Sequence, residues 1–419
     1  MDSRLGKETR DSVLDGCRVL DLADEKGDFC GKLLAGLGAD VIKVEPPGGD
    51  PTRCIGPFYK AVPHPERSLH WYLYNLGKRS ITLNLLTETG REIFLRLVGT
   101  ADIIVETYAP GYLANLDLGY EKLKNLNSHI IMTSITPFGQ EGPYSHFRGS
   151  HLITSSLGGY VYICGDPDRP PVHAGVPIGN LLVGSQAAQA TMLAYYWQQL
   201  SGKGTHIDVS TQEGYLIALL PAQLAYKSHG AIALRETFGP YIPGLRWEPL
   251  YYRCKDGYIA CLTTYWPGRE RVRDWMAEEG MAGDLLDEKW DHIYSKGEPP
   301  TVEEKKHIDE LFQVFAMKHT QAELFPEGQN RGIQLFPINT VDRLIEDPHL
   351  REKEYFINVE HPELNDGLRY QGVPFRMSRT PYSIGRRAPL IGEHNDEVYI
   401  GELGFTTCDL TALGASKVI

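Results

Sequence analysis

Short apolar, β-branched runs alternate with helical stretches through the first half of this chain. Two such runs, at 18–22 and 40–45, predict buried strands, and a helical pattern at 29–37 lies between them. Gly38 follows that helix at the position where a left-handed residue commonly ends one. Further strands are expected at 79–85, 101–107, 129–136 and 205–210, and helices at 88–98 and 181–200. Strands that alternate with helices form parallel sheets, so we expect an α/β fold.

The pattern changes after about residue 226. Residues 251–254 and 258–261 read as two strands joined by an Asp-Gly turn, a strong hairpin signal. An amphipathic helix is expected at 301–319. We therefore expect three parts: a large α/β domain begun by residues 1–225, a small α+β domain at 226–335, and a return to the large domain at 336–419.

Charge and apolar content limit the classes of partner. Lys plus Arg number 42 against 54 Asp plus Glu among 419 residues, which leaves a net charge of −12. An acidic chain does not present the basic field that nucleic acid or an anionic membrane requires. The most apolar stretch, 214–225, is about a dozen residues long and contains Pro221, so a buried helix is expected there instead of a membrane span.

Cysteine usage and the first residues bear on the compartment. The 7 cysteines are scattered, with no CxxC pair, so neither a disulfide framework nor a zinc site is expected. Residues 1–15 are polar and lack the apolar core of a secretion signal. We expect a cytoplasmic protein with no bound metal.

The turn after the first strand argues against a dinucleotide cofactor. A dinucleotide fingerprint needs three glycines in this turn, whereas residues 23–28 contain Gly27 and three acids. Carboxylates at that point repel a pyrophosphate. A nicotinamide or flavin dehydrogenase is therefore not expected.

Five motifs occur in order along the chain. They are GADVIKVEPPGGDPTR at 38–53, NLGKRSI at 75–81, FGQEGPY at 138–144, GKG with DVS at 202–210, and APLIGEHNDE at 388–397. Together, over about residues 16–419, they resemble the family III CoA-transferases (the CaiB/BaiF type, which includes formyl-CoA transferase). The resemblance implies two chains that interlock as a dimer, each with a Rossmann-like large domain and a small inserted domain.

The resemblance also implies a mechanism and its substrates. In the family, an aspartate attacks an acyl-CoA thioester, and an acyl-aspartyl anhydride and then an aspartyl-CoA thioester carry the CoA to an acceptor acid. CoA thioesters are therefore expected as substrates, with no permanently bound cofactor. Covalent catalysis of this kind requires a carboxylate nucleophile.

The position of that nucleophile holds an amide in this chain. The family pattern Gly-Asp-x-x-x-Gly aligns without a gap on residues 179–184, where Asn180 replaces the aspartate. A carboxamide cannot form the anhydride. Three further family positions differ: Phe29 stands in the early active-site loop, and Leu86 and Asn115 replace a common Lys and Arg.

These departures predict a catalytically silent subunit of a heteromeric CoA-transferase. A paralogous chain would supply the aspartate, in an interlocked heterodimer or heterotetramer. The complex would move CoA from a donor such as succinyl-CoA to an acid such as benzylsuccinate. Five residues are candidates for lining a CoA or substrate pocket: Lys43, Lys78, Arg79, Gly139 and Gln140.

Other interpretations stay open at this point. The cations can be ordinary ion-paired groups, the glycine can shape a turn, and Asn180 can be a plain helix N-cap. The chain can be active alone, as a transferase or racemase, through a displaced carboxylate such as Asp166 or Asp168. His151 and His173 are expected to be structural. A third hypothesis is a non-enzymatic scaffold that senses acyl-CoA.

Overall fold

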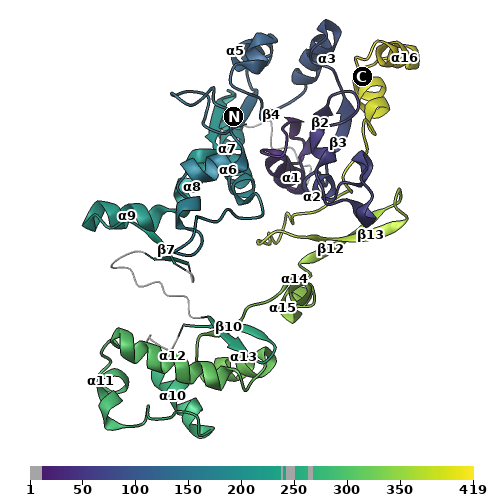
Figure 1. Ribbon diagram of the computed structural model, residues 1–419. Coiled ribbons are helices and arrows are strands. Elements are labelled where there is room, and N and C mark those ends of the chain that lie inside the picture. Colours follow the sequence, from purple (N-terminus) through teal and green to yellow (C-terminus); the bar gives the residue numbers. More distant parts are fainter. Residues whose placement is uncertain (1–11, 237–238, 242–250, 263–267) are drawn as a thin grey trace. The chain divides into compact units, whose positions relative to one another are not determined.

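The computed structural model describes residues 12–236, 239–241, 251–262 and 268–419, and it separates them into two compact units (Figure 1). The first unit takes in the described residues up to Val161, then His173–Leu220 and Glu352–Ile419. The second unit consists of Tyr162–Val172 and the described part of Pro221–Arg351. The domain bounds expected at 225 and 335 stay a sequence prediction.

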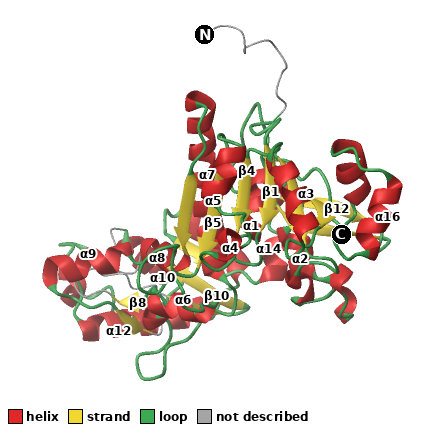
Figure 2. Cartoon of the chain, turned by 90° about the horizontal axis from the view of Figure 1, so that it is seen from above, coloured by secondary structure: helices red, strands yellow, loops and turns green. Residues whose placement is uncertain are grey.

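A six-stranded sheet forms the centre of the first unit (Figure 2). Its strands are β1 (Arg18–Leu22), β2 (Asp40–Glu45), β3 (Arg79–Thr82), β4 (Ile103–Glu106), β5 (Ile131–Thr136) and β6 (His206–Ser210). They lie in the order β3-β2-β1-β4-β5-β6, and every neighbouring pair is parallel. The α/β prediction is confirmed, with β3 ending three residues earlier than expected.

The first unit also contains helices, and some of them cover the two faces of this sheet. Its helices are α1 (Asp28–Gly36), α2 (Leu69–Tyr74), α3 (Glu88–Val98), α4 (Tyr112–Asn115), α5 (Tyr120–Leu126), α6 (His151–Leu157), α7 (Ile178–Ser201), α8 (Thr211–Ala218) and α16 (Thr407–Ala415). A hairpin of β12 (Phe356–His361) and β13 (Asp366–Gln371) completes the unit. Gly38 has a φ of 97°, which confirms the left-handed end of the first helix.

Alternate strand residues divide the core into two layers. Val19, Val41 and Ile103 face α1 and α7, where they pack on Leu34 and Val183. Their neighbours in the strands face the opposite side, which is covered by α3 and α5. Because side chains alternate between faces, Asp21 and Lys43 share the α1 face, whereas Glu106 and Ser134 share the α5 face.

The rest of the described chain is built from shorter elements. They are α9 (Leu220–His229), β7 (Leu234–Glu236), β8 (Gly239–Tyr241), β9 (Tyr251–Cys254), β10 (Gly257–Cys261), α10 (Arg269–Glu278), α11 (Asp291–Tyr294), α12 (Val302–Ala316), α13 (Gln321–Asn330), β11 (Leu335–Pro337), α14 (Val341–Ile345) and α15 (Pro348–Glu352). Strands β9 and β10 pair antiparallel across the Asp-Gly turn, which confirms the predicted hairpin. The helix expected at 301–319 is α12, which is shorter.

The expectation of one buried helix at 214–225 is wrong. The segment forms two helices, α8 and α9, and Pro221 lies in the first turn of α9, where a proline is tolerated. Ile217 is 63% exposed and Leu224 is 61% exposed. In the described ranges, no helix is both long enough and apolar enough to cross a membrane.

Candidate active site

The chain changes direction across the sheet between β1 and β4, which are neighbours in the sheet but not in sequence. In open parallel sheets, ligands bind in the crevice at the carboxyl ends of such strands. Here the loop after β1 meets the end of β4, because the Asp24 amide donates to the Thr107 hydroxyl at 2.9 Å. The candidate active site lies at this crevice.

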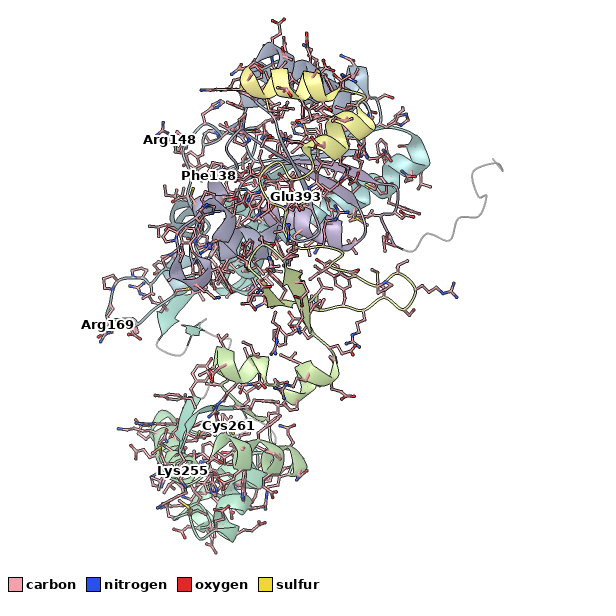
Figure 3. All side chains as sticks on the ribbon, turned by 90° about the vertical axis from the view of Figure 1, so that its right-hand side faces the viewer. Phe138, Arg148, Arg169, Lys255, Cys261 and Glu393 are labelled. Carbon is pink, nitrogen blue, oxygen red and sulfur yellow. The ribbon has the colours of Figure 1, made fainter. Side chains whose placement is uncertain are left out.

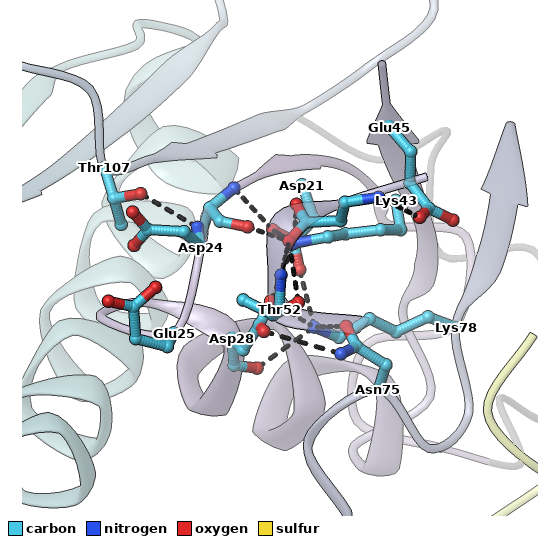
Figure 4. A network of polar contacts seen from close by, with 12 residues as sticks. Asp21, Asp24, Glu25, Asp28, Lys43, Glu45, Thr52, Asn75, Lys78 and Thr107 are labelled. Carbon is cyan, nitrogen blue, oxygen red and sulfur yellow. Dashed lines mark hydrogen bonds and ion pairs between the residues drawn. The ribbon is translucent and has the colours of Figure 1, made fainter. Parts of the chain in front are cut away.

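Two lysines form a buried charged network beside it (Figure 4). The Lys43 ammonium lies 2.7 Å from the Asp28 carboxylate and also donates to the Ala23 carbonyl. The Lys78 ammonium lies 2.7 Å from the Asp21 carboxylate and 2.8 Å from the Asn75 amide oxygen. Both lysines have no exposed surface.

The network contains more carboxyl groups than lysines. Asp50 is a third carboxylate, 3.7 Å from the Lys43 ammonium, so three acids face two lysines. Burial favours the neutral form and raises the pKa of Asp28 to about 7, against the opposing effect of Lys43 and Lys78. Burial also acts on Asp21, but the two lysines outweigh it and hold its pKa below the usual value.

The predicted pocket cations are therefore already paired inside this chain. Arg79 is 4% exposed and binds Asp40, Glu397 and Glu402, at 2.6 to 2.9 Å. Lys43 and Lys78 make the contacts given above. Their assignment to a CoA or substrate pocket stays a prediction.

Asn180 reaches the crevice from α7. Its side-chain amide donates to the backbone carbonyl of Glu25, at 3.1 Å. Helix α7 begins at Ile178 after Pro177, so the interpretation of Asn180 as an N-cap is wrong. Gly179 allows the close packing here, because a Cβ at that residue would lie 2.2 Å from the Tyr215 hydroxyl oxygen.

Acids of the loop after β1 are the site residues that sequence patterns did not single out. Burial, reinforced by the neighbouring Asp24, raises the pKa of Glu25 above its usual value. Asp28 is the first residue of α1, and its carboxylate pairs with Lys43 in the charged network. The sequence feature that could have identified these acids as site residues is that three of them occupy the turn where a nucleotide-binding protein has glycines.

The remaining departures from the family pattern lie apart from this network. Phe29 packs its ring edge-on against Tyr74 at 6.2 Å. Leu86 is 68% exposed and Asn115 is the exposed last residue of α4. Leu86 and Asn115 therefore supply no cation at the two positions where the family often has Lys and Arg.

Gly139 and Gln140 lie in the loop that joins β5 to α6. Phe138 and Arg148, which belong to the same loop, are labelled in Figure 3. Gly139 has a φ of 84°, which confirms its suitability for a turn. The backbone N–H of Gln140 donates to the Asp208 carboxylate at 2.8 Å. Gln140 also lines a cavity on the α5 face of the sheet.

The histidines and the displaced acids are placed as follows. His151 and His173 contact each other edge to face, with ring centroids 4.5 Å apart. Asp166 and Asp168 belong to the second unit, in a loop whose tip carries Arg169 (Figure 3). Among the described residues, no group of three His, Cys, Asp or Glu side chains is arranged to hold a metal ion.

Comparison with known proteins gives a consistent result. The model of the CoA-transferase family III matches residues 14–395. The chain is 34% identical to succinyl-CoA:(R)-benzylsuccinate CoA-transferase subunit BbsE of Thauera aromatica, over 95% of this chain and 97% of that protein. It is also 34% identical to succinyl-CoA–D-citramalate CoA-transferase of Chloroflexus aurantiacus, over 97% and 98%.

Solved structures show the same architecture. A CAIB/BAIF family protein from Brucella suis superposes with a TM-score of 0.79 at 28% identity, over 93% of this chain and 99% of that one. Rv3272 from Mycobacterium tuberculosis superposes with a TM-score of 0.74 at 23% identity, over 92% and 98%, which shows a shared fold.

Proposed function

The chain belongs to family III of the CoA-transferases, which transfer CoA between carboxylic acids, and from this premise we propose that it is the non-catalytic subunit of a heteromeric enzyme. A paralogous subunit supplies the aspartate that attacks the acyl-CoA thioester. That attack releases the CoA thiolate and forms an anhydride, and the thiolate then returns to the aspartyl carbonyl and expels the donor acid. The acceptor carboxylate then attacks the aspartyl-CoA thioester, which releases the CoA thiolate and forms a second anhydride. The thiolate attacks the acceptor's carbonyl in that anhydride, which forms the new acyl-CoA and frees the aspartate.

The observation that carries this proposal is Asn180. Its amide oxygen is neutral and weakly nucleophilic, and its amide nitrogen is engaged with the Glu25 carbonyl. Removing the nucleophile from an enzyme of the covalent type costs roughly 10⁴–10⁶-fold in rate. A chain with this amide in the nucleophile position needs a partner to reach ordinary rates.

Electrostatics at the crevice supports the same conclusion. CoA carries several phosphate charges, and phosphates are bound by Lys or Arg side chains that are free to contact them. Lys43 and Lys78 are instead enclosed by acids, and the loop before α1 adds Asp24 and Glu25. Neither lysine is therefore free to bind the phosphates of a polyanion in this half of the complex.

A stripe on α7 supports a protein partner. Leu193, Tyr196, Trp197 and Leu200 repeat at helical spacing and are 46% to 71% exposed. The opposite side of α7 packs on the sheet through Val183, Ala187 and Thr191 in the core. Contiguous exposed apolar side chains mark protein interfaces, so we assign this stripe to the contact with the Asp-bearing subunit in a heterodimer or heterotetramer.

The relatives suggest the substrate class. The relatives from Thauera aromatica and Chloroflexus aurantiacus are both named as succinyl-CoA-dependent CoA-transferases. The Thauera protein is named as a subunit, and its named acceptor is (R)-benzylsuccinate. We therefore propose succinyl-CoA as donor and a carboxylic acid such as benzylsuccinate as acceptor. The cysteines of this chain are free thiols, which fits the cytoplasm that we propose for it.

Purification of the chain with and without an Asp-bearing paralogue tests the proposal. We expect the pair to co-purify and to exchange CoA between succinyl-CoA and an acid, whereas the single chain shows no exchange above background. Replacing the aspartate of the paralogue by Asn should abolish exchange by the pair, and Asn180→Ala in this chain should not. Exchange at ordinary enzyme rates by the single chain would overturn the proposal.

A second candidate is activity of this chain alone through Glu25. The observation that favours it is the hydrogen bond between the Glu25 backbone carbonyl and Asn180, which places residue 25 beside the nucleophile position, together with the raised pKa of the Glu25 carboxyl group. Hydroxylamine trapping under turnover distinguishes the two candidates. An adduct on the peptide that contains Glu25 supports this candidate, and an adduct only on the aspartate of the paralogue excludes it.

A further inference from the structure

A cavity of about 370 Å³ lies on the α5 face of the sheet, opposite the face that α7 and Asn180 occupy. Helices α4 and α5 and strands β4, β5 and β6 contribute lining residues to it. Pockets of about 300–1,000 Å³ hold small organic molecules. Of the five predicted pocket residues, only Gln140 belongs to its lining.

Glu106 is the most unusual group in the lining. It is the last residue of β4, is 4% exposed, and accepts a hydrogen bond from the Tyr108 backbone amide at 2.7 Å. Among the described residues, no Lys, Arg or His lies within ion-pair distance of its carboxylate. Burial raises the pKa of Glu106 to about 7, although the Ser134 hydroxyl stabilises the charged form.

A donor without a partner lies in the same lining. The side-chain nitrogen of Gln140 is buried and makes no hydrogen bond to any described residue. A buried N–H group left unpaired costs about 1–3 kcal/mol, so native structures rarely leave one. Ser134 and His206 do have partners, because the serine hydroxyl lies 2.9 Å from the imidazole Nε2.

These two groups define the ligand chemistry. Gln140 needs an acceptor, and Glu106 needs either a donor or a group that shares its proton. We propose that the cavity binds a small carboxylic acid, whose carboxyl group lies between Gln140 and Glu106. One carboxyl oxygen accepts from Gln140, and the other shares a proton with Glu106.

An organic amine fits less well. An ammonium group would donate to Glu106 but would leave the Gln140 donor unpaired. The rim acids do not attract an amine strongly either, because Asp117 is paired with Lys122 at 3.3 Å and Glu121 is paired with Lys124.

The proposal is testable because the shared proton makes binding of the acid depend on pH. The charged and polar groups around Glu106 bear on this dependence. They are Asp24 and Lys26 after β1, the Tyr108 amide after β4, Ser134 on β5, His206 on β6, and Tyr120 and Lys122 on α5. Asp24 and Lys26 form an ion pair with each other. The acid therefore binds with uptake of one proton above pH 7, and its affinity is expected to fall about tenfold per pH unit there.

Calorimetric titration of the full chain with phenylacetate, at about pH 6, 7 and 8, measures this dependence. Gln140→Ala should weaken binding about tenfold, because a charge-assisted hydrogen bond is lost. Gln199→Ala is the matched control, since Gln199 is exposed at the other end of the sheet, and it should change nothing. Glu106→Gln should remove the pH dependence.

Several outcomes would overturn the proposal. They are absence of phenylacetate binding, an unchanged affinity in Gln140→Ala, and tighter binding of phenethylamine or benzamide than of phenylacetate. The proposal does not depend on the role of Asn180, so a single chain that proved active in CoA exchange would leave it intact.

Discussion

The side-chain amide of Asn180 donates a hydrogen bond to the backbone carbonyl of Glu25, with 3.1 Å between nitrogen and oxygen. This contact joins the first turn of α7 to the loop after β1. An ionised carboxylate at position 180 cannot donate, and its oxygen would face the carbonyl oxygen of Glu25. The amide is thus suited to this loop, and not merely a substitute for a missing acid.

Asn180→Asp should therefore fail to restore CoA exchange in the single chain. We also expect the free energy of unfolding at neutral pH to fall by about 1 kcal/mol, because the lost hydrogen bond outweighs the favourable helix dipole. Urea unfolding measures the second effect. The loss should disappear below about pH 4, where a protonated carboxyl group can donate again. Full exchange activity in Asn180→Asp would contradict our view of the site.

Lys43→Met should destabilise the chain strongly. Its removal leaves Asp21, Asp28 and Asp50 in a closed interior with Lys78 as the cation that remains, and breaking a buried ion pair in this way costs about 3–5 kcal/mol. Denaturant unfolding at neutral pH gives the value. The exposed Lys203→Met is the control and should change stability by less than about 0.5 kcal/mol.

The double variant Lys43→Met/Asp28→Asn tests the cause of that loss. If the uncompensated carboxylates are responsible, removal of one of them restores part of the stability. A double variant as unstable as the sum of its two single variants would show that the lysine acts through packing instead.

Glu106→Gln should make the chain more stable at alkaline pH. In the folded state the pKa of Glu106 is about 7, above the value of about 4.3 in an unfolded chain. The folded wild type therefore binds the proton more tightly, and it loses stability as the pH rises from about 4.3 to above 7. Integrated over that window the loss is about 4 kcal/mol, and the glutamine variant does not undergo it.

Unfolding of wild type and Glu106→Gln at several pH values measures this difference. The two proteins should be similar near pH 5 and should diverge as the pH approaches 8. A constant difference at all pH values would contradict a raised pKa at this residue.

Sequence patterns were sufficient for the sheet but not for the charged network. Strands β1 and β2 were predictable because consecutive apolar residues fill both faces of a buried strand. The pairing of Lys78 with Asp21 joins residues 57 positions apart, and only the strand order brings them together. The family resemblance therefore indicated Lys43 and Lys78 as cations for a ligand without revealing the acids that surround them.

The cavity on the α5 face illustrates a different limit. Glu106 was unremarkable in the sequence, since a glutamate at a strand end is ordinary, and Gln140 was a pocket candidate only through the family motif at 138–144. Their significance lies in burial and in missing partners, which are properties of packing. The expected buried helix failed for the converse reason, because Ile217 and Leu224 remain uncovered within a single chain.

Leu193→Asp should weaken the assembly with the Asp-bearing subunit while leaving this chain folded. Leu193 is 71% exposed and lies in the apolar stripe of α7, so a charge there costs little in the free chain but is desolvated in an interface. We expect at least a tenfold loss of affinity, measured by light scattering of the co-expressed pair. Gln189→Asp, at an exposed polar position of the same helix, is the matched control. Undiminished pairing in Leu193→Asp would remove α7 from the interface.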